Sequence, residues 1–152
     1  MIVENKCLKL RRTRCTAHLL FLLFLSFLFS LELVVITGAS SGLGRKTTAA
    51  LLRTGQYHVI GAVRDLDKME AVAELDGFPS DRFTPMQCEL NSFESVRKFC
   101  QDVKTFKKTK PIDRLICNAG VYQPSLPYAK WSADGHEQTM QINFLSHFLM
   151  IR

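Results

Sequence analysis

The chain has 152 residues, of which 47% are hydrophobic and 22% charged, with 8 Gly and 5 Pro. This composition excludes disordered, collagen-like and low-complexity proteins, and the length allows one domain with a single hydrophobic core. The net charge is +6, and four lysines lie between residues 104 and 110. We interpret these lysines as the exposed end of an amphipathic helix and expect no nucleic-acid partner, because aromatic residues do not alternate with them.

The five cysteines form no CxxC pair, and no histidine lies at metal-ligand spacing from them. The pattern therefore predicts neither a metal site nor a disulfide framework, and it indicates a reducing compartment. Cys100 shares a helical face with Val96, Phe99 and Val103, so we expect a thiol in the core.

The N-terminal segment, residues 1–32, is basic between residues 6 and 14 and then apolar and uncharged from 19 to 31. This order is typical of a secretory or organelle-entry signal. As a helix the apolar run would rise about 20 Å, less than the ~30 Å of a hydrocarbon core. Two interpretations stay open: a signal or signal anchor, with membrane association, or a mis-set translation start without a structural role.

A glycine-rich turn follows the first regular strand of the sequence. The apolar run Leu33–Thr37 predicts the strand, and a helical segment extends to Arg53. In the intervening Gly38-Ala39-Ser40-Ser41-Gly42-Leu43-Gly44, the three glycines permit a sharp turn, close approach of a pyrophosphate and tight helix packing, respectively. Ser40 and Ser41 add hydroxyl donors. The turn therefore predicts a dinucleotide site at a helix N-terminus.

The end of the second predicted strand, residues 58–63, indicates which dinucleotide is bound. A ribose 2′-hydroxyl calls for an acidic acceptor at this position and a 2′-phosphate for a cation. Arg64 occupies the position, with Lys68 one helical turn further on. Asp65 could instead accept from a 2′-hydroxyl, but we favour a role as cap of the helix that begins at Leu66. The sequence thus favours NADP(H).

The remaining elements complete an alternating pattern of strands and helices. Residues 83–87 and 112–117 predict a third and a fourth strand, the fourth buried on both faces, and Asn91 or Ser92 is expected to cap a helix that extends to Phe106. The pattern predicts a doubly wound parallel α/β sheet of order 3-2-1-4 with a ligand crevice between strands 1 and 4. Asn118-Ala119-Gly120 falls at this crevice.

Together, Thr37-Gly38-x-x-x-Gly42-x-Gly44, Asn118-Ala119-Gly120 and Asn143 resemble the short-chain dehydrogenase/reductase family from Leu33 to Arg152, which implies a Rossmann-like fold. Within that family the sequence resembles the light-dependent protochlorophyllide oxidoreductases, in particular the algal plastid form. The segments that carry this closer resemblance are Val34–Gly44, Tyr57–Ile60, Cys117–Ala119, Val121-Tyr122-x-Pro124, Ala133–Glu137 and Asn143-x-x-x-His147-Phe148.

The resemblance implies light-driven hydride transfer from NADPH to protochlorophyllide, giving chlorophyllide in the chloroplast. Arg64 would hold the 2′-phosphate, and Asn143 would be an active-site residue that helps organise a catalytic lysine through a helix irregularity. In the alternative interpretation Asn143 only bonds backbone within its own helix. The implied cofactor contacts are the pyrophosphate set Gly38, Ser40, Ser41, Gly42, Leu43 and Gly44, the adenine pair Glu89 and Leu90, and the ribose set Asn118, Ala119 and Gly120.

Three departures from the family pattern affect this interpretation. Glu89 stands where the family has Asp, Ser146 replaces a customary Gly, and none of the three tyrosines is followed four residues later by Lys. We therefore expect residues 33–152 to be a truncated NADP-binding domain, the cofactor-binding half of an enzyme whose C-terminal strands are missing. A membrane-anchored retinol-type dehydrogenase and a non-catalytic NADP(H)-binding module are the alternatives, and oligomerisation stays open.

Overall fold

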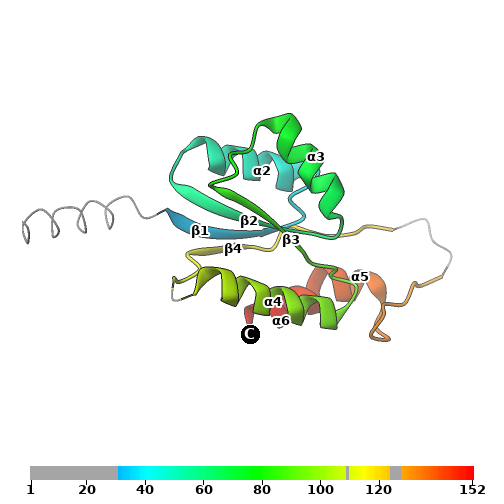
Figure 1. Ribbon diagram of the computed structural model, residues 1–152. Coiled ribbons are helices and arrows are strands. Elements are labelled where there is room, and N and C mark those ends of the chain that lie inside the picture. Colours follow the sequence, from blue (N-terminus) through cyan, green and yellow to red (C-terminus); the bar gives the residue numbers. More distant parts are fainter. Residues whose placement is uncertain (1–30, 109, 124–127) are drawn as a thin grey trace, which may run out of the picture. The chain divides into compact units, whose positions relative to one another are not determined.

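The computed structural model describes residues 31–108, 110–123 and 128–152, and its centre is a parallel sheet (Figure 1). The order of the four strands is β3-β2-β1-β4. Their bounds are β1 Glu32–Thr37, β2 Tyr57–Val63, β3 Phe83–Gln87 and β4 Arg114–Ile116. The predicted doubly wound sheet and its strand order are thereby confirmed. Predictions for residues 1–30 and for Pro124 lie outside the described residues.

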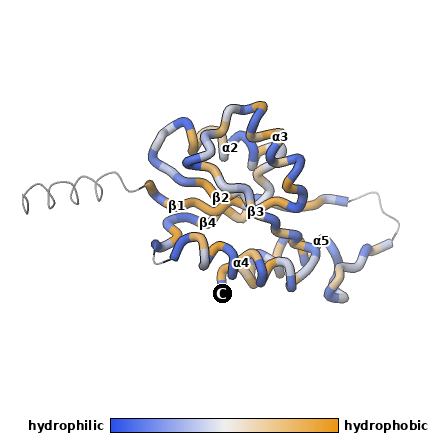
Figure 2. The backbone as a smooth tube through the Cα atoms, viewed as in Figure 1, coloured by the Kyte–Doolittle hydropathy of each residue, from blue (hydrophilic) through white to orange (hydrophobic). Residues whose placement is uncertain are grey.

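Helices cover both faces of the sheet (Figure 1). One layer holds α2 (Gly42–Arg53) and α3 (Leu66–Asp76). The other holds α4 (Phe93–Lys107), a short α5 (Gln138–Met140), the π-helix η1 (Gln141–Leu145) and α6 (Ser146–Ile151). Figure 2 shows the apolar colouring concentrated on the strands between these two layers.

The side chains of β1 alternate between two hydrophobic clusters, one on each face. Leu33 and Val35 point to the cluster that includes Phe99 of α4, whereas Val34 and Ile36 point to the cluster beneath α2 and α3. All four are at most 2% exposed. This alternation follows from the two-residue period of a strand, and burial on both faces is typical of a central parallel strand. Cys100 packs half-buried against the first cluster.

The fourth strand is shorter and more exposed than predicted. It spans Arg114–Ile116 rather than residues 112–117, and none of its side chains is fully buried. Within the described residues β4 pairs only with β1, so it lies at an edge of the sheet, and the prediction of burial on both faces is wrong. Phe106 is also 43% exposed, and its ring lies 5.3 Å from that of His58.

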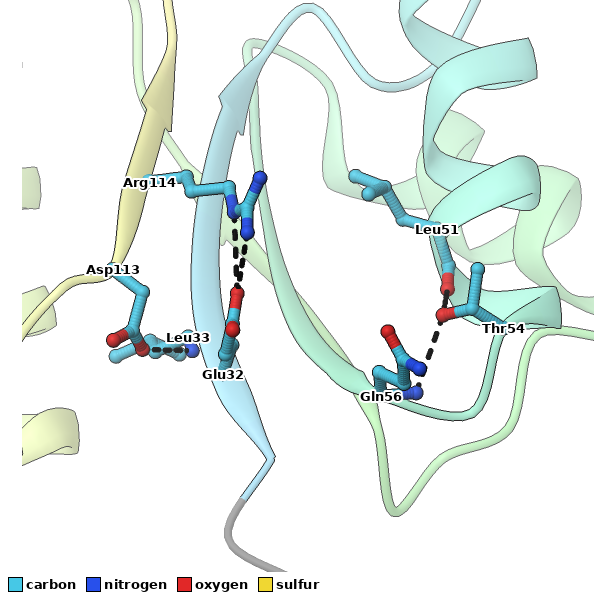
Figure 3. A network of polar contacts seen from close by, with 7 residues as sticks. All are labelled: Glu32, Leu33, Leu51, Thr54, Gln56, Asp113 and Arg114. Carbon is cyan, nitrogen blue, oxygen red and sulfur yellow. Dashed lines mark hydrogen bonds and ion pairs between the residues drawn. The ribbon is translucent and has the colours of Figure 1, made fainter.

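Polar contacts reinforce the short pairing of β4 at the amino end of the sheet (Figure 3). Asp113 accepts a 2.6 Å hydrogen bond from the Leu33 amide and donates its own amide to the Leu33 carbonyl at 2.9 Å. Arg114 forms an ion pair with Glu32 at 2.8 Å. In the same view the Thr54 hydroxyl donates to a carbonyl in the last turn of α2. The contacts of Asp113 and Arg114 support the β1–β4 register, which only three residue pairs define.

Side chains cap the N-termini of α3 and α4. Asp65 accepts from the Lys68 amide at 3.0 Å, and Ser92 accepts from the Ser95 amide at 3.3 Å. The prediction that Asp65 caps the helix beginning at Leu66 is therefore confirmed. In the described ranges no helix is long and apolar enough to cross a membrane, and no three His, Cys, Asp or Glu side chains group as metal ligands.

We predict that Asp65→Ala lowers the free energy of unfolding by about 1 kcal/mol, because the Lys68 amide loses its acceptor at the helix terminus. Asp65→Asn keeps an acceptor oxygen and is expected to stay close to the parent protein. Urea unfolding followed by circular dichroism measures both. Equal losses in the two variants would contradict the capping role.

Candidate cofactor-binding site

The glycine turn between β1 and α2 is packed on one side and open on the other. Gly38 and Gly42 have positive φ values of 72° and 53°. A Cβ on Gly44 would lie 2.2 Å from the Gly38 carbonyl oxygen, whereas a Cβ on Gly42 would meet nothing within 4 Å. The turn therefore needs glycine at position 44 for packing, and the space beside Gly42 is available to a ligand.

The N-terminus of α2 has no side-chain cap, unlike those of α3 and α4. Ser41 occupies the cap position in an extended conformation, but its hydroxyl accepts no bond from the helix, and no acidic residue lies in the first turn. Ser41, Gly42 and Leu43 are exposed, and Ser40 is half-buried. The first amides of a helix carry partial positive charge and need acceptors, which a phosphate provides. The turn thus fits the pyrophosphate of a dinucleotide.

Thr37 connects the end of β1 to the segment that follows β4. Its buried hydroxyl accepts from the amides of Asn118 at 3.0 Å and Ala119 at 2.9 Å. The Asn118 side chain donates to the Thr37 carbonyl at 2.9 Å, and a Cβ on Gly38 would lie 3.1 Å from Ala119. These contacts bring the two predicted ligand segments, the glycine turn and Asn118-Ala119-Gly120, to one edge of the sheet.

Asn143 lies in the π-helix η1 and pairs with the same segment. Its side-chain carbonyl accepts from the Val121 amide at 2.7 Å, and its NH2 group donates to the Val121 carbonyl at 2.8 Å. A Cβ on Gly120 would lie 3.2 Å from Asn143 Oδ1. The alternative in which Asn143 bonds backbone within its own helix is wrong, because its partner is 22 residues away.

Ser146, which departs from the family pattern, is fully buried. Its hydroxyl donates to the Leu90 carbonyl at 2.5 Å, so it ties α6 to the chain after β3. Leu90 itself is 6% exposed in the core, which leaves only its backbone for an adenine contact.

Arg64 extends into solvent at the carboxyl end of β2. Its side chain is 78% exposed, and its only ion pair among the described residues is a 3.9 Å contact between Nε and Glu89 Oε2. Glu89 in turn accepts from the Asn91 amide at 2.9 Å. An exposed pair at this distance contributes little stability, so Arg64 is available to an anionic ligand.

Two residues of this edge were not assigned a role from the sequence: the Thr37 hydroxyl and His147. His147 Nε2 lies 2.9 Å from Thr37 Oγ1, and Nδ1 lies 3.3 Å from the Asn143 carbonyl oxygen. Burial lowers the pKa of His147, with a smaller opposing effect from the Asn143 carbonyl. A lone histidine four residues after Asn143 in an apolar helix was the signal that could have indicated it.

A separate hollow of about 730 Å³ lies between α2 and the loop before β3. Three of its charged groups make contacts within the protein: Arg45 pairs with Asp76 at 2.6 Å, and Arg82 donates to the Leu52 carbonyl at 2.9 Å. The pairing raises the pKa of Arg45 and lowers that of Asp76. The hollow shares only Gly42 with the glycine turn, so it is distinct from the crevice.

The chain belongs to the short-chain dehydrogenase family, because the model of that family matches residues 32–152. It is 48% identical to protochlorophyllide reductase A, chloroplastic, of Arabidopsis thaliana over 120 residues, which are 78% of this chain and 29% of the relative. It is 47% identical over 119 residues to protochlorophyllide reductase, chloroplastic, of Marchantia paleacea, of which it covers 25%. The chain thus spans less than a third of the length of these relatives.

Solved structures share the fold. An uncharacterized protein from Mycobacterium paratuberculosis has a TM-score of 0.65 and 35% identity, covering 80% of this chain and 41% of that one. An alcohol dehydrogenase from the archaeon Thermococcus sibiricus, complexed with 5-hydroxy-NADP, has a TM-score of 0.61 and 25% identity, covering 80% and 51%.

We predict that Gly44→Ala destabilises the protein by about 1–3 kcal/mol, because the added methyl group meets the Gly38 backbone at 2.2 Å. Displacement of α2 should also weaken NADPH binding in a fluorescence titration. Gly77→Ala is the control: unlike Gly44, Gly77 has a positive φ of 66°, and nothing lies within 4 Å of its Cβ position. It should lose stability through backbone strain and keep its affinity. Similar affinities in the two variants would show that Gly44 packing does not shape the site.

We predict that the protein loses stability as the pH falls below about 6.5, the ordinary histidine value. Burial lowers the pKa values of His147 and His58, so the unfolded chain binds more protons in this range. The stabilisation is complete above the unfolded pKa and is lost as pH falls through the folded pKa. Urea midpoints at pH 7.5 and 5.5, conditions set about one unit to either side, measure the loss. A smaller loss is expected in His147→Gln.

Proposed function

We propose that residues 33–152 form an NADPH-binding domain and that the chain is the cofactor-binding part of a protochlorophyllide reductase. The observation that carries the proposal is the uncapped N-terminus of α2 behind the glycine turn, at the same edge of the sheet as the exposed Arg64. This arrangement supports the proposal, because backbone amides suit a pyrophosphate and an exposed guanidinium suits a further phosphate.

Different residues at the carboxyl ends of the strands would bind different parts of the cofactor. The turn from Gly38 to Gly44 would bind the pyrophosphate, and Arg64 would bind the 2′-phosphate by a charge-assisted contact. Glu89 and the Leu90 backbone would lie toward the adenine, and Asn118, Ala119 and Gly120 toward the adenosine ribose. The bound nicotinamide would supply a hydride. Asn143 would hold the segment after β4 through Val121 and so fix the wall of the crevice.

Two findings support NADPH rather than NADH. One oxygen of Asp65 caps α3, which gives this carboxylate a structural role that does not need a ribose 2′-hydroxyl. The alcohol dehydrogenase from Thermococcus sibiricus, which shares the fold, was solved in complex with 5-hydroxy-NADP. That complex supports binding of a phosphorylated dinucleotide by this fold.

The substrate and the location follow from the relatives. Identity of 42–48% to proteins named protochlorophyllide reductase, chloroplastic, supports protochlorophyllide as the pigment substrate and the chloroplast as the location. The whole enzyme would then carry out light-driven reduction to chlorophyllide in chlorophyll biosynthesis.

We predict that the protein binds NADPH more tightly than NADH and that Arg64→Ala removes most of the difference. A charge-assisted contact contributes roughly 1.5–3 kcal/mol, about 10- to 100-fold in affinity. Arg53→Ala at the far end of α2 is the matched control, since it also removes one exposed arginine. Isothermal titration with each cofactor measures the preference. Equal affinities of the parent protein for NADPH and NADH would refute the assignment of Arg64.

We predict that the 152-residue chain binds NADPH but forms no chlorophyllide when illuminated with NADPH and protochlorophyllide. The reason is that no Tyr in the sequence has Lys four residues on, the pair that the resemblance implies for proton delivery. Absorbance of chlorophyllide after illumination measures the reaction, with an intact protochlorophyllide reductase as the positive control. Product formed by this chain would show that its own residues suffice.

A further inference from the structure

We propose that His147 is a positioning residue for the cofactor crevice. Nε2 of His147 accepts a hydrogen bond from the Thr37 hydroxyl. This bond orients the hydroxyl so that its oxygen accepts hydrogen bonds from the Asn118 and Ala119 amides. The inference rests on the proposed function, because it concerns the crevice to which NADPH is assigned. It adds a specific residue, on the last helix, that sets the geometry of the segment after β4.

The hydrogen-bond inventory of Thr37 fixes the direction of each contact. A hydroxyl has one proton and two acceptor lone pairs. The amides of Asn118 and Ala119 donate to Thr37 Oγ1 at 3.0 and 2.9 Å and use both lone pairs. The remaining contact, 2.9 Å to His147 Nε2, is therefore a bond that the hydroxyl donates.

The same inventory determines the tautomer of His147. Since Nε2 accepts a hydrogen bond, the ring proton lies on Nδ1, which faces the backbone carbonyl oxygen of Asn143 at 3.3 Å. One neutral tautomer thus satisfies every polar atom of the cluster. The effect of burial, which lowers the pKa of His147, acts in the same direction because it favours the neutral ring.

Burial makes the acceptor necessary. Thr37 is 1% exposed and His147 6% exposed, so solvent does not readily replace a missing partner. Without Nε2 the hydroxyl proton must find another acceptor, and its reorientation removes the lone pair that now serves Asn118 or Ala119. The effect of losing His147 is therefore expected in the backbone of the crevice and not only in α6.

The last two helical elements, η1 and α6, hold the segment after β4 at two points. Asn143 bonds Val121 directly, and His147, four residues later, acts through Thr37 on Asn118 and Ala119. Asn143 lies in the π-helix η1, and His147 lies in the helix α6 that follows it. These two consecutive elements thus contact both ends of the same short segment.

A second histidine provides an internal control. His58 Nε2 also lies 2.9 Å from a threonine hydroxyl, that of Thr84. Both residues lie near the start of their strands, β2 and β3, at the edge of the sheet opposite the crevice. Thr48 offers a matched control for Thr37, because its buried hydroxyl has no hydrogen-bond partner among the described residues.

The test measures NADPH affinity and amide hydrogen exchange of the full chain in His147→Phe, His147→Gln, Thr37→Val and the double variant His147→Phe/Thr37→Val. We expect His147→Phe to weaken NADPH binding roughly 10-fold and to reduce the protection of the Asn118 and Ala119 amides. His147→Gln, whose amide oxygen can accept the Thr37 proton, should recover most of both losses. The double variant should be no weaker than Thr37→Val alone.

The controls separate positioning from general loss of stability. His58→Phe and Thr48→Val should leave NADPH affinity and the two amides unchanged. Nitrogen-15 spectra of the parent protein should show His147 protonated at Nδ1 and not at Nε2. Additive losses in the double variant, no recovery in His147→Gln, or the opposite tautomer would each overturn the inference. If the parent protein fails to bind NADPH, the proposed function is refuted, and amide protection and the tautomer still decide the role of His147.

Discussion

The two-sided burial of β1 is the constraint on which the rest of the structure depends. The strand pairs with β2 on one side and β4 on the other, and its side chains enter the core clusters of both faces. A strand in this position fixes where the chain must leave the sheet. It leaves at Thr37, so the glycine turn, the start of α2 and the segment after β4 all converge on the end of one strand.

Polar groups at the end of β1 either have hydrogen-bond partners within the protein or remain available to a ligand. The Thr37 hydroxyl and carbonyl have hydrogen-bond partners in Asn118, Ala119 and His147, as buried polar groups must. The first amides of α2, a few residues later, have no side-chain cap. The polar groups of Thr37 are therefore paired within the protein, and the amides next to them keep their donors available, which is the combination expected of a preformed anion site.

Local features of the fold and the order of the strands could be predicted from the sequence, whereas individual long-range contacts could not. The glycine turn, the Asp65 cap and the bounds of β3 depend on residues within a few positions of one another. The exposure of β4 depends instead on which strand is its neighbour. The contact between Thr37 and His147 joins residues 110 positions apart, and no local pattern encodes such a pair.

The candidate site shows the same division between local and distant information. The sequence predicted that the second strand ends directly before Arg64, and β2 does end at Val63. By contrast, Leu90 turned inward to the core, where the hydroxyl of Ser146 reaches its carbonyl across 56 residues. Asn143 lies in the π-helix η1, which agrees with the helix irregularity that the resemblance implied. Its pairing with Val121 joins residues 22 positions apart, and no local pattern indicated that partner.

The uncapped start of α2 also makes ligand occupancy part of the folding equilibrium. A phosphate bound there would do for α2 what Asp65 and Ser92 do for α3 and α4, and a ligand that binds only the native state stabilises it by RT ln(1 + [L]/Kd). At a cofactor concentration about 100 times Kd this amounts to about 2.7 kcal/mol, more than a typical side-chain cap contributes. The resistance of such a protein to proteolysis would then follow the local concentration of the dinucleotide, in either redox state, because the pyrophosphate is common to both.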